Sequence, residues 1–233
     1  MRISDRVAEL LAEFGVKHVF MVTGGGAMHL NDALGRNQSL KVINMHHEQS
    51  CSMAADGYAR TNNQMACVNV TTGPGGINAI NGVFGAWTDS VPMFVVSGQV
   101  KRETLNFDNS KLRQLGDQEN NIVSMVKSIT KFSYILKNPN YVDDLVSKAL
   151  KIASTGRPGP VWIDIPIDIQ GAPYEKSKQI KLNRLSIPKV KKVDKSTINK
   201  VVRLIQNSKR PAILVGGGVR ASGAQKEFVK FIN

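Results

Sequence analysis

The stretch that decides the fold class spans residues 66–76 and reads ACVNVTTGPGG. Its first half is a short, mostly apolar run, which is typical of a buried strand. Its second half combines glycine and proline, the residues that most strongly interrupt regular structure. A helical pattern follows directly. A strand that passes through a glycine turn into a helix is the repeating unit of an α/β protein.

The same unit recurs on both sides of this stretch. Strands are expected at residues 19–22, 42–45, 66–71, 92–97, 132–136 and 161–165, and helices at 5–14, 48–60 and 141–153. We expect Ser4 to cap the first helix and Gly15 to end it. Short apolar strands separated by helices predict an α/β domain with a parallel sheet covered by helices on both faces.

Composition divides the chain into three parts. Residues 1–170 carry the alternating pattern and are expected to form the first domain. Residues 171–195 lose the periodicity and are rich in lysine, proline and serine, which is typical of a linker. Residues 196–233 resume with a helical pattern and an expected strand at 212–215, which would begin a second α/β domain. One strand and two helices cannot close a core, so this second domain is expected to be truncated.

The positive charge is concentrated in residues 171–233. The formal net charge is +13. Residues 1–170 hold 16 Lys and Arg against 15 Asp and Glu, whereas residues 171–233 hold 15 against 3. Aromatic residues do not alternate with this basic excess, so a solvated linker explains it better than a nucleic-acid surface. We therefore expect no nucleic-acid partner.

Other bulk features favour a cytoplasmic protein. No apolar run approaches the roughly 20 residues that span a bilayer, so no membrane segment is expected. The first residues open a helix and show no apolar signal region. Cys51 and Cys67 are the only cysteines, too few for a disulfide framework or a cysteine metal site.

Ligands of open parallel sheets bind at the carboxyl ends of the strands. Three such ends carry candidate residues, at 23–26, 46–48 and 71–76. The first and third are glycine-rich turns that let a ligand approach backbone N–H groups at the start of a helix. Each could equally be a tight turn that serves the fold alone. Neither matches Gly-x-Gly-x-x-Gly with an acidic residue about 20 positions on, which argues against a dinucleotide site.

The second of these ends is more specific, because Glu48 begins a helix whose next residues are small or apolar. Such a helix is packed on both sides, so we expect the carboxylate to be partly buried. Glu48 is therefore a candidate for acid–base chemistry. The alternative is a carboxylate that only satisfies the backbone donors of the helix start. His46 and His47 are interpreted as histidines at the end of a strand, without a visible metal partner.

In order and spacing, these pieces resemble the N-terminal domain of thiamine-diphosphate enzymes related to acetolactate synthase and the 2-oxo-acid decarboxylases. The resemblance covers essentially the whole chain, and its most specific stretch runs from His47 to Arg60. The other segments that carry it are residues 19–26, 32–34, 72–75 with 78, 89–92, 98–99, 118–119, 129–131, 156–161 and 164–166. Residues 210–218 are similar to the start of the family's central domain.

The resemblance implies a catalytic role for Glu48. In this family a carboxyl group hydrogen-bonded to the aminopyrimidine ring nitrogen of thiamine diphosphate promotes loss of the thiazolium proton, which forms a nucleophilic ylid. The other residues that the resemblance places in the site are Gly24 and Gly25 beside cofactor and substrate, Thr72, Gly73, Pro74 and Gly75 in the pyrimidine pocket, Asn78 behind it, and Gln118 on the substrate side. For each of these, maintenance of the fold is the alternative role.

The resemblance also implies parts that these residues lack. The family holds the diphosphate and Mg²⁺ in a third domain, through a Gly-Asp-Gly segment. Residues 116–118 resemble that segment only superficially, because the third residue is glutamine, so we expect no metal site in this chain. In the family the cofactor lies between two subunits, so a homodimer or homotetramer is expected, and this chain alone is expected to be inactive. FAD, which some relatives bind in the central domain, stays open.

The implied reaction is thiamine-diphosphate-dependent decarboxylation and carboligation of a 2-oxo acid, with pyruvate to acetolactate as the first choice. Residues 112–119 depart from the segment usual in acetolactate synthases and look like homologues from surface-polysaccharide pathways. A different 2-oxo acid or a sugar-linked reaction is the alternative. Two other classes remain: a non-catalytic regulatory or assembly paralogue, and a nucleotide-binding module whose glycine turns cradle phosphates.

Overall fold

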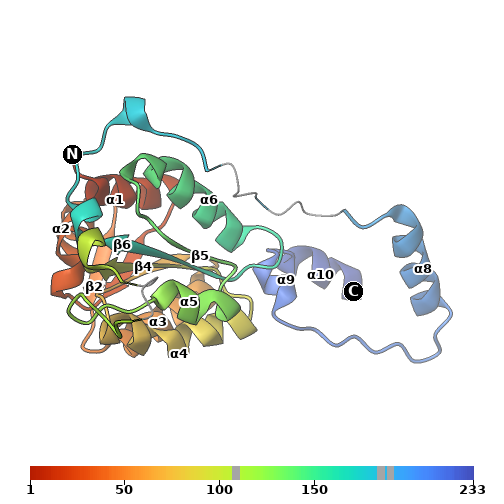
Figure 1. Cartoon of the computed structure of the whole chain (residues 1–233). Coiled ribbons are helices and arrows are strands. Elements are labelled where there is room, and N and C mark those ends of the chain that lie inside the picture. Colours follow the sequence, from red (N-terminus) through yellow and green to blue (C-terminus); the bar gives the residue numbers. More distant parts are fainter. Residues whose placement is uncertain (107–110, 183–186, 188–191) are drawn as a thin grey trace. The chain divides into compact units, whose positions relative to one another are not determined.

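The computed structural model describes residues 1–106, 111–182, 187 and 192–233. The chain forms two compact units, residues 1–187 and residues 188–233 (Figure 1). The first unit contains the sheet and all the candidate site residues. The described residues of the second unit form three helices.

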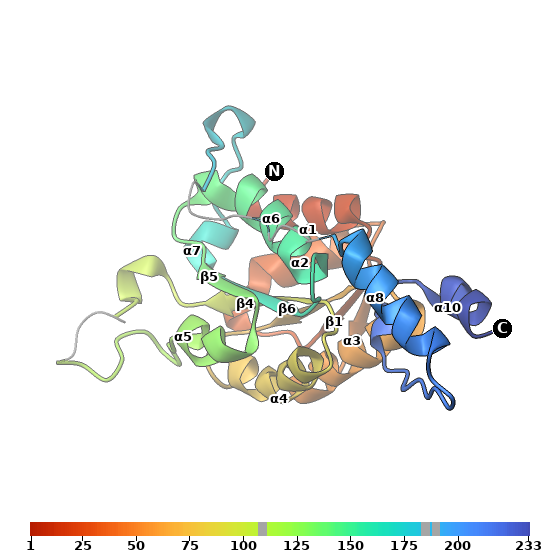
Figure 2. The same cartoon turned by 90° about the vertical axis from the view of Figure 1, so that its right-hand side faces the viewer.

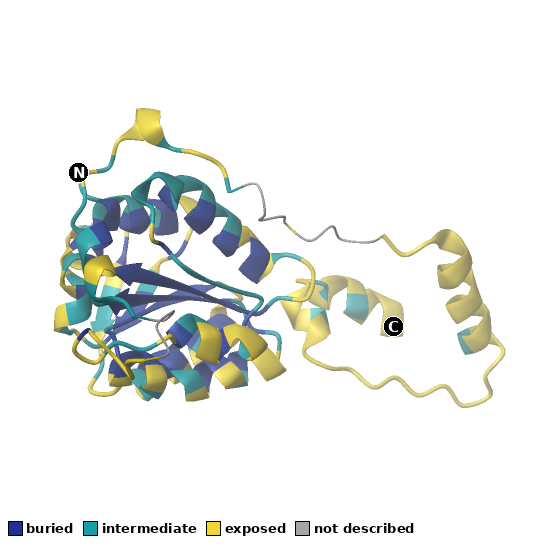
Figure 3. Cartoon of the chain, viewed as in Figure 1, coloured by how far each residue is buried: buried dark blue, intermediate teal, exposed yellow. Residues whose placement is uncertain are grey.

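The first unit is built on a six-stranded sheet in the order β2-β1-β3-β4-β6-β5, in which every neighbouring pair is parallel. The strands are β1 (His18–Met21), β2 (Lys41–Asn44), β3 (Ala66–Val70), β4 (Met93–Gln99), β5 (Phe132–Ile135) and β6 (Pro160–Pro166). Strands β3, β4 and β6 are buried along their whole length, whereas the edge strands β2 and β5 are partly exposed (Figure 3). Strands buried on both faces need a helical layer on each face.

Helices provide both layers (Figures 1 and 2). One face carries α1 (Ile3–Phe14), α2 (Met28–Arg36), α6 (Val142–Ser154) and α7 (Ile167–Gln170); the other carries α3 (Glu48–Asn62), α4 (Pro74–Thr88) and α5 (Ile122–Val126). Each layer packs its own apolar cluster against the sheet, with Leu11 and Leu150 in the first and Val83 and Ile122 in the second. The predicted α/β fold, a parallel sheet covered on both faces, is confirmed.

The first helix does not begin as predicted. Ser4 lies inside the first turn of α1, where its Oγ is buried and has no hydrogen-bond partner among the described residues. Arg2 precedes the helix, and its backbone N–H donates to Asp5 Oδ2 at 2.8 Å. The expectation of a Ser4 cap is therefore wrong, because Asp5 supplies the acceptor from the third helical position. Gly15 ends the helix with a φ of 97°, as predicted.

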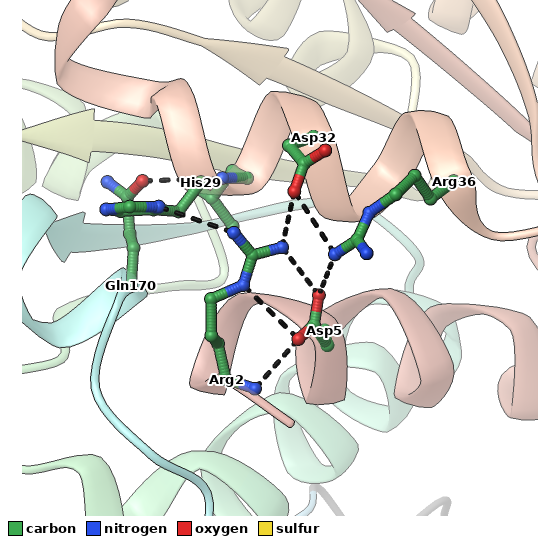
Figure 4. Close-up of polar contacts among 7 residues, drawn as sticks. Arg2, Asp5, His29, Asp32, Arg36 and Gln170 are labelled. Atoms are coloured by element: carbon green, nitrogen blue, oxygen red, sulfur yellow. Dashed lines mark hydrogen bonds and ion pairs between the residues drawn. The ribbon is translucent and has the colours of Figure 1, made fainter.

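The residues at this helix start also tie α1 to α2 (Figure 4). Arg2 Nη2 lies 2.9 Å from Asp5 Oδ1 and 2.5 Å from Asp32 Oδ2. Arg36 Nη2 contacts the same two carboxylates at 3.0 and 3.1 Å. The hydrogen bond from Arg2 holds the pKa of Asp5 below its usual range. Four alternating charges in one cluster fix the two helices relative to each other more firmly than an isolated surface pair would.

The second unit contains α8 (Lys195–Gln206), α9 (Gly218–Ala221) and α10 (Gln225–Ile232). Asp194 caps α8 by accepting from Thr197 N at 2.8 Å. The strand expected at residues 212–215 is not formed, and Leu214 is fully exposed. A strand is stable only when a neighbour pairs its backbone groups, and the described residues of this unit offer no second strand. That prediction is therefore wrong for the structure described.

The contact between α3 and α4 gives the first prediction. A Cβ at Gly82 of α4 would lie 2.7 Å from Met53 N and would collide with Ser52 Oγ, both on α3. We expect Gly82→Ala to lower the free energy of unfolding by about 1–3 kcal/mol, the usual range for overpacking. Gly85→Ala is the matched control, because a Cβ there meets nothing within 4 Å. It should be neutral or stabilise by up to about 1 kcal/mol. Urea denaturation followed by circular dichroism measures both, and equal stabilities would contradict the prediction.

Candidate active site

The sheet changes its winding direction between β1 and β3. From β1 the chain moves outward to β2, then returns past β1 to β3 and continues to β4. The segment after β1 consequently enters α2 on one face, and the segment after β3 enters α4 on the other. In open α/β sheets, ligands bind at the carboxyl ends of the strands at such a switch point. Residues 24–26 and 71–76, both candidates from the sequence, follow these two strands directly.

Glu48 stands at the first position of α3, beside this switch point. The preceding His47 caps the helix, because its Nδ1 accepts from Gln49 N at 3.1 Å. The Glu48 side chain is half-buried, and its Oε2 accepts from Asn78 Nδ2 of α4 at 2.9 Å. Glu48 and Asn78, 30 residues apart in sequence, are thus brought together by the packing of the first turns of α3 and α4. One carboxylate oxygen is fixed by this bond.

The other oxygen of Glu48 faces a glycine. A Cβ at Gly75 would stand 3.4 Å from Glu48 Oε1 and 2.7 Å from Thr71 Cγ2. A side chain at position 75 would therefore collide with Thr71 at the end of β3 and would fill the space next to Oε1. With glycine there, no Cβ stands against this oxygen.

The turn into α4 requires glycine for its backbone as well. Gly73 has φ 59° and ψ −125°, a conformation that residues with a Cβ rarely adopt. A Cβ at Gly73 would also lie 2.7 Å from Gln118 O. Thr72 is buried just before it, and Pro74, the first residue of α4, is exposed. The Thr72–Gly75 turn is thus closed against the segment that carries Gln118.

The glycine turn after β1 packs on the end of β3. A Cβ at Gly24 would lie 2.5 Å from Thr71 Cβ, and Gly26 N donates to Thr71 Oγ1 at 3.1 Å. Asn31 Nδ2 of α2 holds Gly24 O at 3.2 Å. Gly25 is exposed, and a Cβ there would meet no described atom within 4 Å. The two glycine turns are therefore neighbours, although 45 residues separate Gly26 from Thr71.

Gln118 is exposed in the loop between β4 and α5 and has a φ of 58°, unusual for a residue other than glycine. The next residue, Glu119, orders this loop by accepting from the backbone N–H groups of Asn106, Leu115 and Gly116 at 2.6, 2.9 and 2.7 Å. Burial alone would raise the pKa of Glu119, but these three bonds hold it below the usual range. Among the described residues, no group of three or more His, Cys, Asp or Glu side chains is placed to hold a metal ion.

Sequence reasoning missed a group of buried polar residues behind the Thr72–Gly75 turn. Ser97 and Gln99 on β4 lie beside Asp164 on β6, and all three are buried. Burial raises the pKa of Asp164 to about 7, although hydrogen bonds from Ser97 and Gln99 oppose this shift. One signal in the sequence could have found this group: Asp164 is an acidic residue inside the apolar run 161–165. Burying a carboxyl group in a central strand costs free energy unless the group is hydrogen-bonded, so partners for it were to be expected.

The carboxylate of Glu48 and the two glycine turns lie where open α/β sheets bind ligands, and sequence comparison shows the family to which such a domain belongs. Residues 1–125 match the family described as "Thiamine pyrophosphate enzyme, N-terminal TPP binding domain". Residues 198–233 match "Thiamine pyrophosphate enzyme, central domain". The chain belongs to the thiamine pyrophosphate enzyme family.

Curated relatives of this chain include acetolactate synthases. It is 35% identical over 232 residues to the acetolactate synthase large subunit of Haemophilus influenzae, a match that covers 98% of this chain and 39% of that protein. It is 35% identical over 219 residues to the chloroplastic acetolactate synthase of Arabidopsis thaliana, which covers 92% of this chain and 31% of the relative. The large subunit of Lactococcus lactis is 32% identical over 229 residues, with 98% and 39% covered. The chain spans about two fifths, or less, of the length of these relatives.

No helix in the described part of the chain is long and apolar enough to cross a membrane.

The Gly73 geometry gives a second prediction. Gly73→Ala places a Cβ where the backbone disfavours it and where Gln118 O already lies. We expect a loss of about 1–3 kcal/mol in the free energy of unfolding, the usual cost of one strained residue. Gly25→Ala, in the exposed turn with open space around it, should leave stability unchanged within about 0.5 kcal/mol. Chemical denaturation measures both, and a stable Gly73→Ala protein would show that the turn is not constrained as described.

The buried Asp164 gives a third prediction, on pH dependence. Its folded-state pKa of about 7 lies above the ordinary 3.8, so the folded state binds the proton more tightly than the unfolded state. The free energy of unfolding should therefore fall as the pH rises from about 4 to about 7. Carboxyl groups with lowered pKa, such as Asp5, act below this window. The Asp164→Asn variant should lose this part of the slope in denaturation curves recorded across the range. An unchanged slope would contradict the assignment.

Proposed function

We propose that the protein carrying this chain is a thiamine-diphosphate-dependent enzyme that decarboxylates a 2-oxo acid and joins the product to an acceptor, with pyruvate to acetolactate as the first reaction to test. Membership of the thiamine pyrophosphate enzyme family and about 35% identity to acetolactate synthases support this proposal. The single observation that carries the site is the Glu48 carboxylate, with one oxygen bound by Asn78 and the other facing Gly75.

The arrangement around Glu48 assigns different tasks to its two oxygens. Because Oε2 accepts from Asn78, the carboxylate cannot turn freely, and Oε1 is the oxygen available to a ligand. We assign Oε1 to bind the aminopyrimidine ring nitrogen and to hold or release the proton at that contact. Thiamine diphosphate, when bound, supplies the nucleophilic carbon and the electron sink of the reaction.

The glycine turns fit a flat ring beside this carboxylate. Gly73 and Gly75 stand where a Cβ would collide with Gln118 or Thr71, so the turn presents backbone atoms at these positions. We propose that residues 72–75 line the pyrimidine pocket, that Asn78 holds Glu48 in place, and that Gly24, Gly25 and Gln118 border the cofactor and substrate.

The remaining parts of the active site are proposed to lie outside this chain. We expect Mg²⁺ and the diphosphate to be bound by other residues of the protein, and the site to be shared between subunits of a homodimer or homotetramer. Ile77, Phe84 and Trp87 on α4 expose apolar side chains, which is consistent with a covering subunit. We also propose a cytoplasmic location, in keeping with two free, buried cysteines.

The division along the chain into three parts is likewise a proposal. We propose that residues 1–170 form the pyrimidine-binding domain, that 171–195 link it to the next domain, and that 196–233 begin the central domain. The match of residues 198–233 to the family's central domain supports the last of these.

The test of this function is the Glu48→Gln variant of the intact protein. Glutamine can still hydrogen-bond but cannot transfer a proton, so turnover should fall on the order of 10²-fold or more. Glu103→Gln is the matched control, because Glu103 is an exposed carboxylate outside the site and its removal should leave the rate unchanged. The assay follows CO₂ and acetolactate together, with pyruvate, thiamine diphosphate and Mg²⁺.

Each outcome of this assay has a distinct meaning. Acetolactate formation supports the carboligase reaction, whereas CO₂ without acetolactate supports a decarboxylase or another acceptor. If the protein binds thiamine diphosphate but does not turn over pyruvate, other 2-oxo acids are assayed as substrates. Turnover near the wild-type rate in Glu48→Gln would contradict the proposed role of the carboxylate.

A further inference from the structure

A chain of hydrogen bonds runs through the interior of the sheet and ends at the candidate site. Trp162 Nε1 donates to Ser97 Oγ at 2.8 Å, and Ser97 Oγ donates to Asp164 Oδ1 at 2.6 Å. Gln99 Nε2 donates to Asp164 Oδ2 at 2.9 Å. Thr72 Oγ1 then donates to Gln99 Oε1 at 2.9 Å. Every member of this chain is buried, so each bond is made in a low-dielectric interior where a missing partner is costly.

The amide of Gln99 is fully used. Its Nε2 donates two hydrogen bonds, to Asp164 Oδ2 and to Asn120 O, both at 2.9 Å. Its Oε1 accepts two, from Thr72 Oγ1 at 2.9 Å and from Val100 N at 3.0 Å. A side-chain amide has two donors and two acceptor lone pairs, so none is left over. The amide can satisfy these four partners in only one orientation.

Asp164 fixes that orientation together with Asn120 O, which only accepts, and Val100 N, which only donates. Above its raised pKa, Asp164 is a carboxylate that only accepts hydrogen bonds, so it too requires the nitrogen end of Gln99 to face it. The oxygen end must then face Thr72, whose hydroxyl is held as a donor. Asp164 thus acts on the turn at Thr72 through Gln99, without touching the turn itself.

Gln99 also joins the two segments that close on each other at the site. Asn120, whose carbonyl Gln99 holds, donates from Nδ2 to Gly73 O at 3.3 Å. Gly73 in turn packs on Gln118 O, which Thr72 Oγ1 approaches at 3.4 Å. One buried amide therefore sets the position of residues 72–73 relative to residues 118–120.

We propose that Asp164 and Gln99 are positioning residues for cofactor binding: they hold the Thr72–Gly73 turn and the 118–120 segment at the spacing that admits the aminopyrimidine beside Glu48. This inference rests on the proposed function, because it takes thiamine diphosphate as the ligand of that turn.

The test compares cofactor binding by variants of the intact protein, measured by calorimetry in the presence of Mg²⁺. In Asp164→Asn the new side chain can point an amide N–H at Gln99 Nε2, which removes one acceptor of the Gln99 amide. If the amide turns over in response, it loses its bonds to Asn120 O and Val100 N, so either response disturbs the turn at Thr72. We expect the Kd for thiamine diphosphate to rise on the order of 10-fold or more, the scale of one or two displaced buried hydrogen bonds. Asp168→Asn is the control: this carboxylate binds Arg102 at the surface, and its loss should leave the Kd unchanged.

A double-mutant cycle separates positioning from general destabilisation. Thr72→Val removes the hydroxyl that Gln99 orients and should weaken binding by itself. If Asp164 acts through Thr72, adding Asp164→Asn to Thr72→Val should weaken binding much less than Asp164→Asn does alone. Full additivity of the two losses would overturn the proposal, and so would a wild-type Kd for Asp164→Asn.

The remaining outcomes can be told apart. If Asp164→Asn does not fold, as judged by circular dichroism, Gln99→Met is measured in its place, because it keeps the side-chain length and removes the bonds to Asp164, Thr72 and Asn120. It must raise the Kd, and the rise must be much smaller in a protein that already carries Thr72→Val. If the wild-type protein itself binds no thiamine diphosphate, the proposed function fails and this inference falls with it. Wild-type binding with unaltered variants would overturn only the inference.

Discussion

Every strand of the sheet runs in the same direction, and the position of the site depends on this constraint. Because neighbouring strands are parallel, all their carboxyl ends lie along one edge, and the residues that follow β1 and β3 meet there. The register pairs Met21 with Asn69, the last residue of β1 with the residue before the end of β3. The turns that follow, at residues 24–26 and 71–75, consequently start side by side. Reversal of either strand would separate them.

Close approach of backbones makes this edge compact, and glycine is what permits it. Gly24 packs on Thr71 and Gly73 packs on Gln118, at distances that leave no room for a Cβ. A third contact lies behind the first, where Gly98 of β4 meets the backbone of Gly26 and Ala27. The contacts of Gly73 and Gly98 are with backbone atoms, and that of Gly24 is with the short side chain of Thr71, so little in these turns can move. A flexible side chain such as that of Glu48 is placed accurately only because its surroundings are rigid in this way.

A group of buried polar residues lies behind the turns of the candidate site. Asp164 and Gln99 are buried in strands whose other residues, apart from Ser97, are apolar. A buried charge is tolerated only when hydrogen bonds compensate for lost hydration. Here the compensating partners are Ser97, Gln99 and, through the amide, Thr72. The hydrogen bonds that compensate for burial of the Asp164 carboxylate thus also fix the position of the turn at Thr72. A hydrophobic pair at these positions would pack well but would leave Thr72 without its acceptor.

Much of this protein was decided by local sequence. The alternation of apolar strands, glycine turns and helices predicted the parallel sheet and most of its boundaries, because periodicity and glycine act over a few neighbouring residues. The place of Glu48 at a helix start was predicted in the same way. The capping of α1 was not, since Ser4 and Asp5 are both acceptable acceptors and only the packing of α1 selects Asp5.

Only the tertiary structure decided which distant residues meet. The strand expected at 212–215 has a suitable composition, but a strand needs a partner, and the described residues of the second unit contain no other strand. Asn78 reaches Glu48 across 30 positions, and Gln99 reaches Asp164 across 65. Local pattern contains no information about such pairs, because hydrogen bonds between strands and helices depend on register and packing. The sequence by itself therefore determined most of the helices and strands and the place of Glu48 at a helix start. The tertiary structure determined which residues Glu48 and Asp164 contact.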